Sequence, residues 1–368
     1  MAKRMRVAWA AAAVVPLTLL AACGSSGTPT PSSTSSASPA AAGGTVSLTE
    51  TGSTLMFPLF GAWQTAYNKT YPNVNLTTAG TGSGTGIADA ANGTVTMGGS
   101  DAYLSSAEMA QNHNLINIPL AVSAVMVSYN LPGVKGHLKF NGTVLSKIYA
   151  GKITKWNDPA IKALNPGVTL PSMAIAPLHR SDSSGTTFVF VSYLNAQDPT
   201  NWPTADVGTT VNWASVPAAA AELGNGGMVA ACGTTKGCIA YIGTSYLTQT
   251  KAAHLGEGML ANKAGKFTLP THSSIQAALA DFEKVTPANE TQALINTSAP
   301  KGYPDINYEY VIVNKKQPSA AEASALKQFL KWTLTTGATS TFLGPVNFEP
   351  LSSRVTSLSL TQINSISS

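Results

Sequence analysis

The chain has 368 residues, of which 44% are hydrophobic and only 11% are charged, and its formal net charge is +5. Three of the positive charges, Lys3, Arg4 and Arg6, stand together at the N-terminus, so the rest of the chain carries only about +2. This excludes the basic surface that nucleic-acid binding requires. The length exceeds what one hydrophobic core usually serves, and two lobes are therefore expected.

The first 22 residues have the pattern of an export signal, with a positive start followed by the apolar stretch 7–22. That stretch is too short to span a bilayer comfortably. It ends in Leu20, Ala21 and Ala22, and Cys23 follows, a tetrad that resembles the cleavage site of bacterial lipoproteins. The resemblance implies cleavage before Cys23 and acylation of its sulfur, which would anchor the protein to the outer face of the cytoplasmic membrane. The alternative is an ordinary secretory signal that carries a cysteine.

A spacer is expected next, because residues 23–44 are dominated by Ser, Thr, Pro, Ala and Gly and carry no charge. Beyond it, short apolar or alternating runs predict strands over residues 46–49, 74–78, 121–129, 173–178, 239–242 and 308–314. Stretches of helical composition lie at 59–67, 87–91, 188–194, 275–282 and 320–334. This alternation predicts an α/β architecture with largely parallel sheets.

Three loops rich in Gly, Ser and Thr, residues 52–55, 80–86 and 180–186, each follow a predicted strand and precede a helix. A helix start exposes unpaired N–H groups at the positive end of the helix dipole, and glycine lets a ligand approach the backbone closely. One such loop is more often only a helix cap. Three of them directed at one point would enclose a small tetrahedral oxyanion.

Two charged residues strengthen this interpretation. Arg180, at the start of the third loop, could donate two parallel hydrogen bonds to an oxyanion, and Asp182 could orient it through an ion pair. Asp101 is unexpected, because a carboxylate is a poor neighbour for an anion. Its alternative role is to cap a helix over residues 103–110.

The remaining cysteines, Cys232 and Cys238, form an even pair in a chain that leaves the reducing cytoplasm, so a disulfide is expected. Closing so short a loop would stabilise the fold by about 2 kcal/mol. The spacing does not match a redox or metal motif, and no cofactor or metal is expected.

Five segments carry a family resemblance: TGSTLMFP (51–58), GTGSGTG (80–86), GGSDAY (98–103), HRSDSSGTTF (179–188) and YPDINYEYVIVN (303–314). They resemble the phosphate-binding lipoproteins of bacterial phosphate ABC importers, closest to the actinobacterial form. The resemblance implies a two-lobed, type II periplasmic-binding-protein-like fold with mixed sheets flanked by helices. Lobe one would be 45–128 plus 305–368, and lobe two 129–304. The chain would cross between them near 125–130 and 303–310.

The resemblance also implies a ligand set for inorganic phosphate. The side chains or backbone N–H groups that would donate hydrogen bonds belong to Thr54, Leu55, Ser83, Arg180, Ser184, Gly185 and Thr186. Asp101 would accept the proton that phosphate carries. Sulfate has no such proton at neutral pH and would leave the buried carboxylate unpaired, so Asp101 is expected to reject sulfate. Hinge closure around the dehydrated anion would present a monomeric protein to the permease subunits of the importer.

Two alternatives remain open. The first is binding of another tetrahedral oxyanion or of a phosphate ester. The second is a secreted phosphomonoesterase, since arginine, serine and carboxylate groups can also stabilise a transferring phosphoryl group. Against catalysis, the histidines are scattered, and neither an HExxH nor a GxSxG motif occurs. The sequence therefore favours a binding protein over an enzyme.

Overall fold

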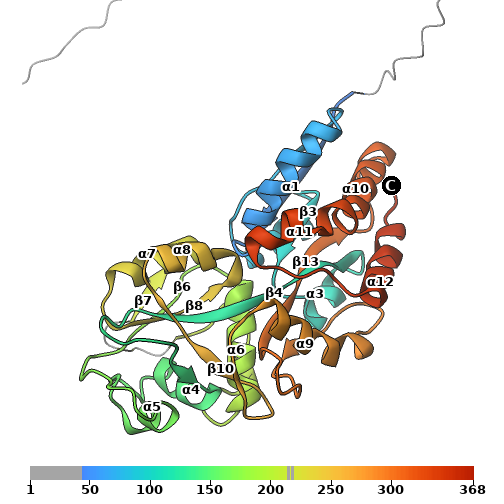
Figure 1. Ribbon diagram of the computed structural model, residues 1–368. Coiled ribbons are helices and arrows are strands. Elements are labelled where there is room, and N and C mark those ends of the chain that lie inside the picture. Colours follow the sequence, from blue (N-terminus) through green and yellow to red (C-terminus); the bar gives the residue numbers. More distant parts are fainter. Residues whose placement is uncertain (1–43, 214–215, 217–218) are drawn as a thin grey trace, which may run out of the picture. The chain divides into compact units, whose positions relative to one another are not determined.

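The computed structural model describes residues 44–368, apart from residues 214–215 and 217–218 (Figure 1). The expected export signal, Cys23 and nearly all of the spacer lie outside these residues. Within the described part of the chain, no helix combines the length and the apolar character needed to cross a membrane.

The N-terminal part alternates strand and helix. Strand β1 (Val46–Gly52) pairs in parallel with β2 (Val74–Thr77) on one side and with β3 (Met97–Ser100) on the other. Helix α1 (Phe57–Thr70) connects β1 to β2, α2 (Ser83–Asn92) connects β2 to β3, and α3 (Ser106–Gln111) follows β3. Because the strands are parallel, the loops that leave their carboxyl ends share one edge of the sheet.

A second parallel group is formed by β6 (Ala176–Arg180), β7 (Ala220–Glu222) and β8 (Cys238–Gly243), with β6 between the other two. Its helices are α4 (Gly142–Tyr149), α5 (Pro159–Leu164), α6 (Gly185–Gln197), α7 (Gly224–Thr234) and α8 (Leu247–Ala252). The expected disulfide is present: Cys232 in α7 is bonded to Cys238 at the start of β8.

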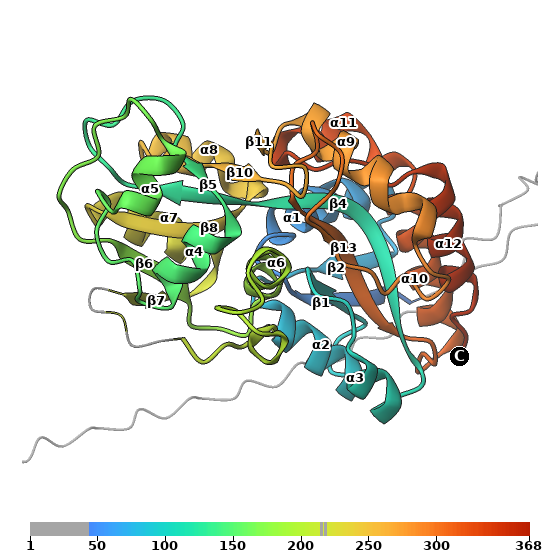
Figure 2. The same cartoon turned by 90° about the horizontal axis from the view of Figure 1, so that it is seen from below.

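Two long strands join the parallel groups. Strand β4 (Leu115–Tyr129) pairs antiparallel with β13 (Asp305–Asn314) as far as Ala124 and with β8 from Val125 onward. The resulting order is β2-β1-β3-β13-β4-β8-β6-β7. Figures 1 and 2 show β4 running from one group of elements into the other. The expectation of largely parallel sheets is thus wrong at the centre, because the chain enters on β4 and returns on β13 without a helical crossover.

The other elements complete the two lobes. A small sheet contains β5 (Lys139–Phe140), β10 (Met259–Ala261) and β11 (Phe267–Thr268), while β9 (Gly256–Glu257) pairs with β4 and β12 (Leu294–Ile295) with β13. The remaining helices are α9 (His272–Phe282), α10 (Ala320–Thr333), α11 (Ser340–Leu343) and α12 (Ser353–Asn364). Short 3₁₀ turns are Thr204–Asp206, Thr244–Tyr246, Glu283–Val285, Thr336–Ala338 and Gly344–Val346.

The described residues pack into two apolar clusters, one of which contains residues of both lobes, such as Ile87 and Tyr149. In one cluster, Trp63 and Tyr67 of α1 pack edge-on against Phe329 of α10, and Phe60 packs against the same ring at a tilt. In the other, the ring of Phe190 in α6 stacks on Tyr241 of β8 with 4.5 Å between ring centroids. Aromatic pairs of this kind add about 0.5–1.5 kcal/mol beyond the area that they bury. The fold is the expected mixed α/β, two-lobed architecture. Its parallel strands carry the Gly-, Ser- and Thr-rich loops at their carboxyl ends.

All the predicted strands and helices overlap observed ones. The main differences lie at their ends. Helix α2 begins at Ser83, four residues before the predicted start at Ile87, and β6 extends to Arg180. Both elements extend into loops that contain Gly and Ser, and hydrophobic patterning alone does not predict such extensions.

Candidate functional site

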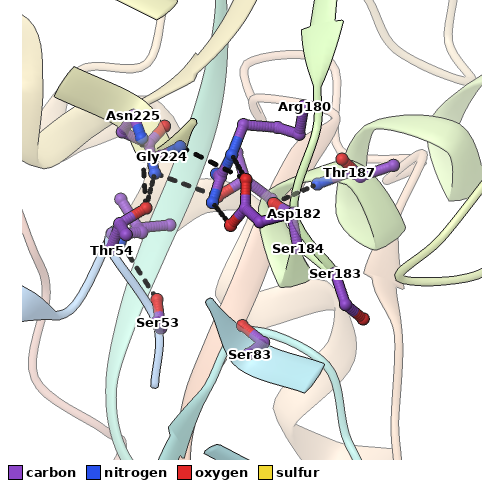
Figure 3. Close-up of polar contacts among 12 residues, drawn as sticks. Ser53, Thr54, Ser83, Arg180, Asp182, Ser183, Ser184, Thr187, Gly224 and Asn225 are labelled. Atoms are coloured by element: carbon purple, nitrogen blue, oxygen red, sulfur yellow. Dashed lines mark hydrogen bonds and ion pairs between the residues drawn. The ribbon is translucent and has the colours of Figure 1, made fainter. Parts of the chain in front are cut away.

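Four helices, α1, α2, α6 and α7, have N-terminal loops that contact one another. Thr186 Oγ1 in α6 donates to Asp101 Oδ2 over 2.8 Å, and the N–H of Asn225 in α7 donates to Thr54 Oγ1, before α1, over 3.1 Å. The N–H of Gly84 in α2 donates to the carbonyl oxygen of Ser183 over 3.0 Å. Loops from both parallel groups therefore meet at one place (Figure 3).

Asp101 lies at the centre of this meeting point and is only 1% exposed. Ser53 Oγ donates to one carboxylate oxygen and Thr186 Oγ1 to the other, while the Asp101 N–H donates to Ser83 Oγ over 3.2 Å. Burial raises the pKa of Asp101, and the two hydroxyl donors and the charge of Arg180 oppose that rise. The alternative role of Asp101 as a helix cap is wrong, because α3 is capped by Ser105 in a capping box.

Arg180 is a buried cation with its own counter-ion. Its Nε donates to Asp182 Oδ1 over 2.7 Å and its Nη2 pairs with Asp182 Oδ2, while its side chain is 1% exposed. Asp182 also accepts from the Gly224 N–H over 3.2 Å. Although burial acts to raise the pKa of Asp182, the hydrogen bonds and charge of Arg180 outweigh it and lower that pKa. The third guanidinium nitrogen, Nη1, is buried and has no partner among the described residues.

Asn225 belongs to the same network, although the sequence analysis missed it. Its Nδ2 group donates to Thr54 Oγ1 over 3.0 Å and to Thr186 Oγ1 over 3.2 Å, and its Oδ1 accepts from the Gly243 N–H over 2.9 Å. The bond from Gly243 fixes which end of the amide is the donor. Figure 3 shows Asn225 directed at Thr54 beside Arg180 and Asp182.

A signal for Asn225 was available in the sequence. Residues 224–227 read Gly-Asn-Gly-Gly, follow the short strand β7 and begin α7. This is the pattern that identified the other three loops. The preceding strand β7 is only three residues long, which is too short to be predicted from the sequence pattern.

The hydroxyl groups of two predicted ligands are already oriented by these bonds. Thr54 Oγ1 accepts twice from Asn225, so its own hydrogen is directed elsewhere. The hydrogen of the Thr186 hydroxyl is committed to Asp101. Thr186 can therefore offer a further ligand its backbone N–H, in the first turn of α6, rather than its side chain.

The other predicted ligands have structural contacts of their own. The Leu55 N–H donates to Ser53 Oγ over 3.0 Å, and Ser184 Oγ caps α6 by accepting from the Thr187 N–H over 3.2 Å. A Cβ atom on Gly185 would lie 2.5 Å from Ser83 Oγ, so only glycine allows α6 and α2 to approach this closely. Ser53, not predicted as a functional residue, thus bonds both the first loop and Asp101.

One histidine, His179, lies beside Arg180. His179 stacks on Trp213 with 5.0 Å between ring centroids, and its Nδ1 lies 3.2 Å from the Arg180 carbonyl oxygen. These two residues help to line a cavity of about 280 Å³ beside Arg180. Across the described residues, no group of three or more His, Cys, Asp and Glu side chains could hold a metal ion.

Residues 35–336 match the model of the PBP superfamily domain. The chain is 32% identical to the phosphate-binding protein PstS of Xylella fastidiosa over 79% of this chain and 78% of that protein. It is 31% identical to the phosphate-binding protein PstS3 of Mycobacterium bovis over 95% of each. It is also similar to the crystal structure of a phosphate-binding protein from Stenotrophomonas maltophilia, with a TM-score of 0.64, 20% identity, and coverage of 86% of this chain and 93% of that one.

Proposed function

The chain belongs to the PBP superfamily and, within it, to the family of phosphate-binding proteins, and on that basis we propose that it binds inorganic phosphate outside the cytoplasm and delivers it to an ABC importer. Binding, rather than phosphate-ester hydrolysis, is the proposed function, and its support is that the relatives are named as phosphate-binding proteins.

One observation carries the assignment of the site to an anion. Arg180 is buried, and its Nη1 has no acceptor among the described residues. A buried, charged donor without a partner costs several kcal/mol unless a ligand supplies an acceptor. The Asp182 carboxylate already neutralises the guanidinium and holds it in place. Nη1 is therefore the donor for an oxyanion.

The remaining donors surround the same point. Thr54 and Ser83 contribute hydroxyl groups, and Gly185 and Thr186 contribute the first N–H groups of α6. Leu55 completes the set through its N–H, which would exchange Ser53 Oγ for the anion. Ser184 would donate its hydroxyl group, because its own N–H donates to the Thr209 carbonyl oxygen over 2.8 Å. Support comes from the convergence of four helix N-termini, since each exposes N–H groups at the positive end of a helix dipole.

Asp101 supplies selectivity. A carboxylate in this position accepts a hydrogen bond only from a ligand that carries a proton, as phosphate does and sulfate does not at neutral pH. Support comes from its burial and from the two hydroxyl donors that occupy one position on each of its oxygens. An ionised carboxylate has about four acceptor positions, so a position remains for the ligand.

Ligand binding closes the two lobes, residues 45–128 with 305–368 and residues 129–304. Support for closure comes from bonds that join the proposed lobes: Thr186 to Asp101, Asn225 to Thr54, and Ser245 Oγ to the Leu55 carbonyl oxygen over 2.8 Å. A ligand held by both lobes favours the closed state, because only that state makes both sets of bonds. The permease subunits of the importer would recognise the closed state.

The protein acts in the cell envelope, at the outer face of the cytoplasmic membrane, as a monomer that is anchored through acylated Cys23. Support for the anchor is the sequence before Cys23, together with the uncharged spacer that follows it. Mass spectrometry of the membrane-extracted protein tests it, since acylation would add the mass of the lipid to the N-terminal peptide.

Isothermal titration of the purified protein with phosphate, arsenate, sulfate and a phosphate monoester tests the main proposal. We expect micromolar or tighter binding of phosphate, comparable binding of arsenate, and negligible binding of sulfate and of the ester. Tight binding of the ester, or of sulfate, would contradict the assignment of Asp101 and of an enclosing site.

A further inference from the structure

A second buried carboxyl group, Glu309, lies beside Asp101 and has no role in the site described so far. Strand β13 runs antiparallel to β3, with Tyr310 opposite Ser100. The residue before Tyr310 therefore lies level with the residue after Ser100, which places Glu309 next to Asp101. Glu309 is 0% exposed.

The contacts of Glu309 are those of a neutral acid. Ser123 Oγ and, over 3.3 Å, Asn307 Nδ2 both donate to Glu309 Oε1. The other oxygen, Oε2, is buried and receives no hydrogen bond from any described residue. Neither of the ion pairs found in the described part of the chain includes Glu309. The titratable group that faces it is Asp101, and Arg180 acts on Asp101 from β6.

Two carboxyl groups side by side in a dry environment do not both ionise, and they hold one proton between them. Asp101 has two hydroxyl donors, Ser53 and Thr186, and the nearby cation Arg180. No cation among the described residues pairs with Glu309, and burial followed by the charge of Asp101 raises the pKa of Glu309 well above its usual range. The proton therefore resides on Glu309, and Asp101 is the anion.

We propose that Glu309 is a positioning residue of the anion site, a neutral acid that donates its proton in a hydrogen bond to Asp101 and so keeps Asp101 an anionic acceptor for the hydroxyl group of the ligand. This inference rests on the proposed function. With Glu309 as a donor, Asp101 accepts from Ser53, Thr186 and Glu309, and one acceptor position remains for phosphate. Without it, Asp101 would lose one of the bonds that stabilise its ionised form, and a protonated Asp101 would be a poorer acceptor for the ligand.

Two substitutions of Glu309 test whether its hydrogen bond to Asp101 is what supports ligand binding. In Glu309→Gln, the amide keeps a donor toward Asp101 and an acceptor for Ser123, and it carries no charge. In Glu309→Leu, the donor is lost at similar volume. A matched control is Glu290→Gln, because Glu290 is also a buried carboxyl, but it bonds Ser359 and not the site.

Phosphate titration calorimetry at pH 7.5 should give Kd values within about threefold of the wild type for Glu309→Gln and for the control. Glu309→Leu should bind at least about tenfold more weakly, as expected for loss of a hydrogen bond to a charged group. Equal weakening of both Glu309 variants would overturn the proposal, because the donor would then be irrelevant. Tighter binding by either would do so as well, since it would mean that Glu309 is ionised.

A spectroscopic measurement covers the case in which the leucine variant does not fold. The infrared difference spectrum of the wild type with and without phosphate should contain the carbonyl stretch of a protonated carboxyl group, shifted by the ligand. Glu309→Gln should abolish this band and Glu290→Gln should preserve it. A band that persists in Glu309→Gln would refute the proposal. Failure of the wild type to bind phosphate would instead contradict the proposed function itself.

Discussion

Thr186 and Asp101 are 85 positions apart in the sequence, yet Thr186 Oγ1 donates to Asp101 Oδ2 over 2.8 Å. Thr186 is in the first turn of α6 and Asp101 follows β3, so the bond joins the two parallel groups of strands. It makes the carboxylate part of the contact between lobes. The proposed anion selectivity and the proposed lobe closure would therefore depend on the same side chain.

Substituting Asp101→Asn should lower selectivity more than affinity for phosphate. The asparagine amide can donate to an oxyanion that carries no proton, and it removes the buried negative charge that rejects sulfate. Calorimetry with each anion should show sulfate binding at least about tenfold tighter than in the wild type, with a smaller change for phosphate. The exposed Asp206→Asn serves as the control. Continued rejection of sulfate by the variant would refute the role of Asp101.

Substituting Arg180→Ala should weaken phosphate binding by about 2–5 kcal/mol, because it removes a buried charged donor and leaves Asp182 unpaired. The matched control is Arg354→Ala, in the only other arginine of the described residues, which is exposed and bonds the Thr286 carbonyl oxygen. Circular dichroism should report an unchanged fold for both. A phosphate Kd within threefold of the wild type for Arg180→Ala would argue against an anion at Nη1.

The sequence was sufficient to find three of the four loops, because each of these lies between a strand and a helix whose patterning is clear, whereas the fourth follows a strand of only three residues. The sequence could not predict which residues these loops contact in the fold. That Asp101 accepts from Ser53 and Thr186 depends on how two groups of strands are joined, and the antiparallel pairing of β4 with β13 leaves no local signal. Glu309 is a similar case. Alternating apolar residues identify its strand, but only the register with β3 places it beside Asp101.

Substituting Asn225→Ala should weaken phosphate binding by about tenfold without a comparable loss of stability. The variant loses the bonds from the Asn225 amide to Thr54 and Thr186. The bond to Thr54 crosses between the proposed lobes and fixes the direction of the Thr54 hydroxyl group. Calorimetry measures the affinity, and small-angle scattering measures the fraction of closed protein at saturating phosphate. Exposed Asn289→Ala is the control. Unchanged affinity and closure would show that the Asn225 amide is not needed.

Replacing both cysteines of the disulfide, Cys232→Ser with Cys238→Ser, should lower the free energy of unfolding by about 2 kcal/mol. The loop between them is short, with a sequence separation of 6, so the cross-link restricts the unfolded chain only modestly. Urea denaturation with and without reductant measures the effect, and the variant should be insensitive to reductant. Because the bond lies at the far end of α7 from Asn225, the phosphate Kd should stay within about twofold of the wild type.

Stability should fall as the pH rises from 4.5 to 8, through buried carboxyl groups away from Asp101. Burial raises the pKa of Glu290 to about 8, against the opposing bond from Ser359, and burial likewise raises the pKa of Glu50 to about 8. Below pH 4.5 both the folded and the unfolded states hold these protons, so the groups cost nothing. Between the unfolded-state pKa of 4.5 and the folded-state pKa of about 8, only the unfolded state ionises. In that range each group lowers the free energy of unfolding by about 1.4 kcal/mol per pH unit.

Glu290→Gln isolates one of these contributions, because an amide cannot ionise. Its free energy of unfolding, measured by urea denaturation at pH 5, 6, 7 and 8, should decline less steeply than that of the wild type, while Asp206→Asn should follow the wild type. The residual slope in Glu290→Gln would then come from Glu50 and from other buried carboxyl groups with raised pKa values, among them Glu309 and Asp305. Parallel profiles for the wild type and Glu290→Gln would mean that Glu290 is ionised in the folded protein, and its burial beside Ser359 would then need a positive partner that the described residues do not supply.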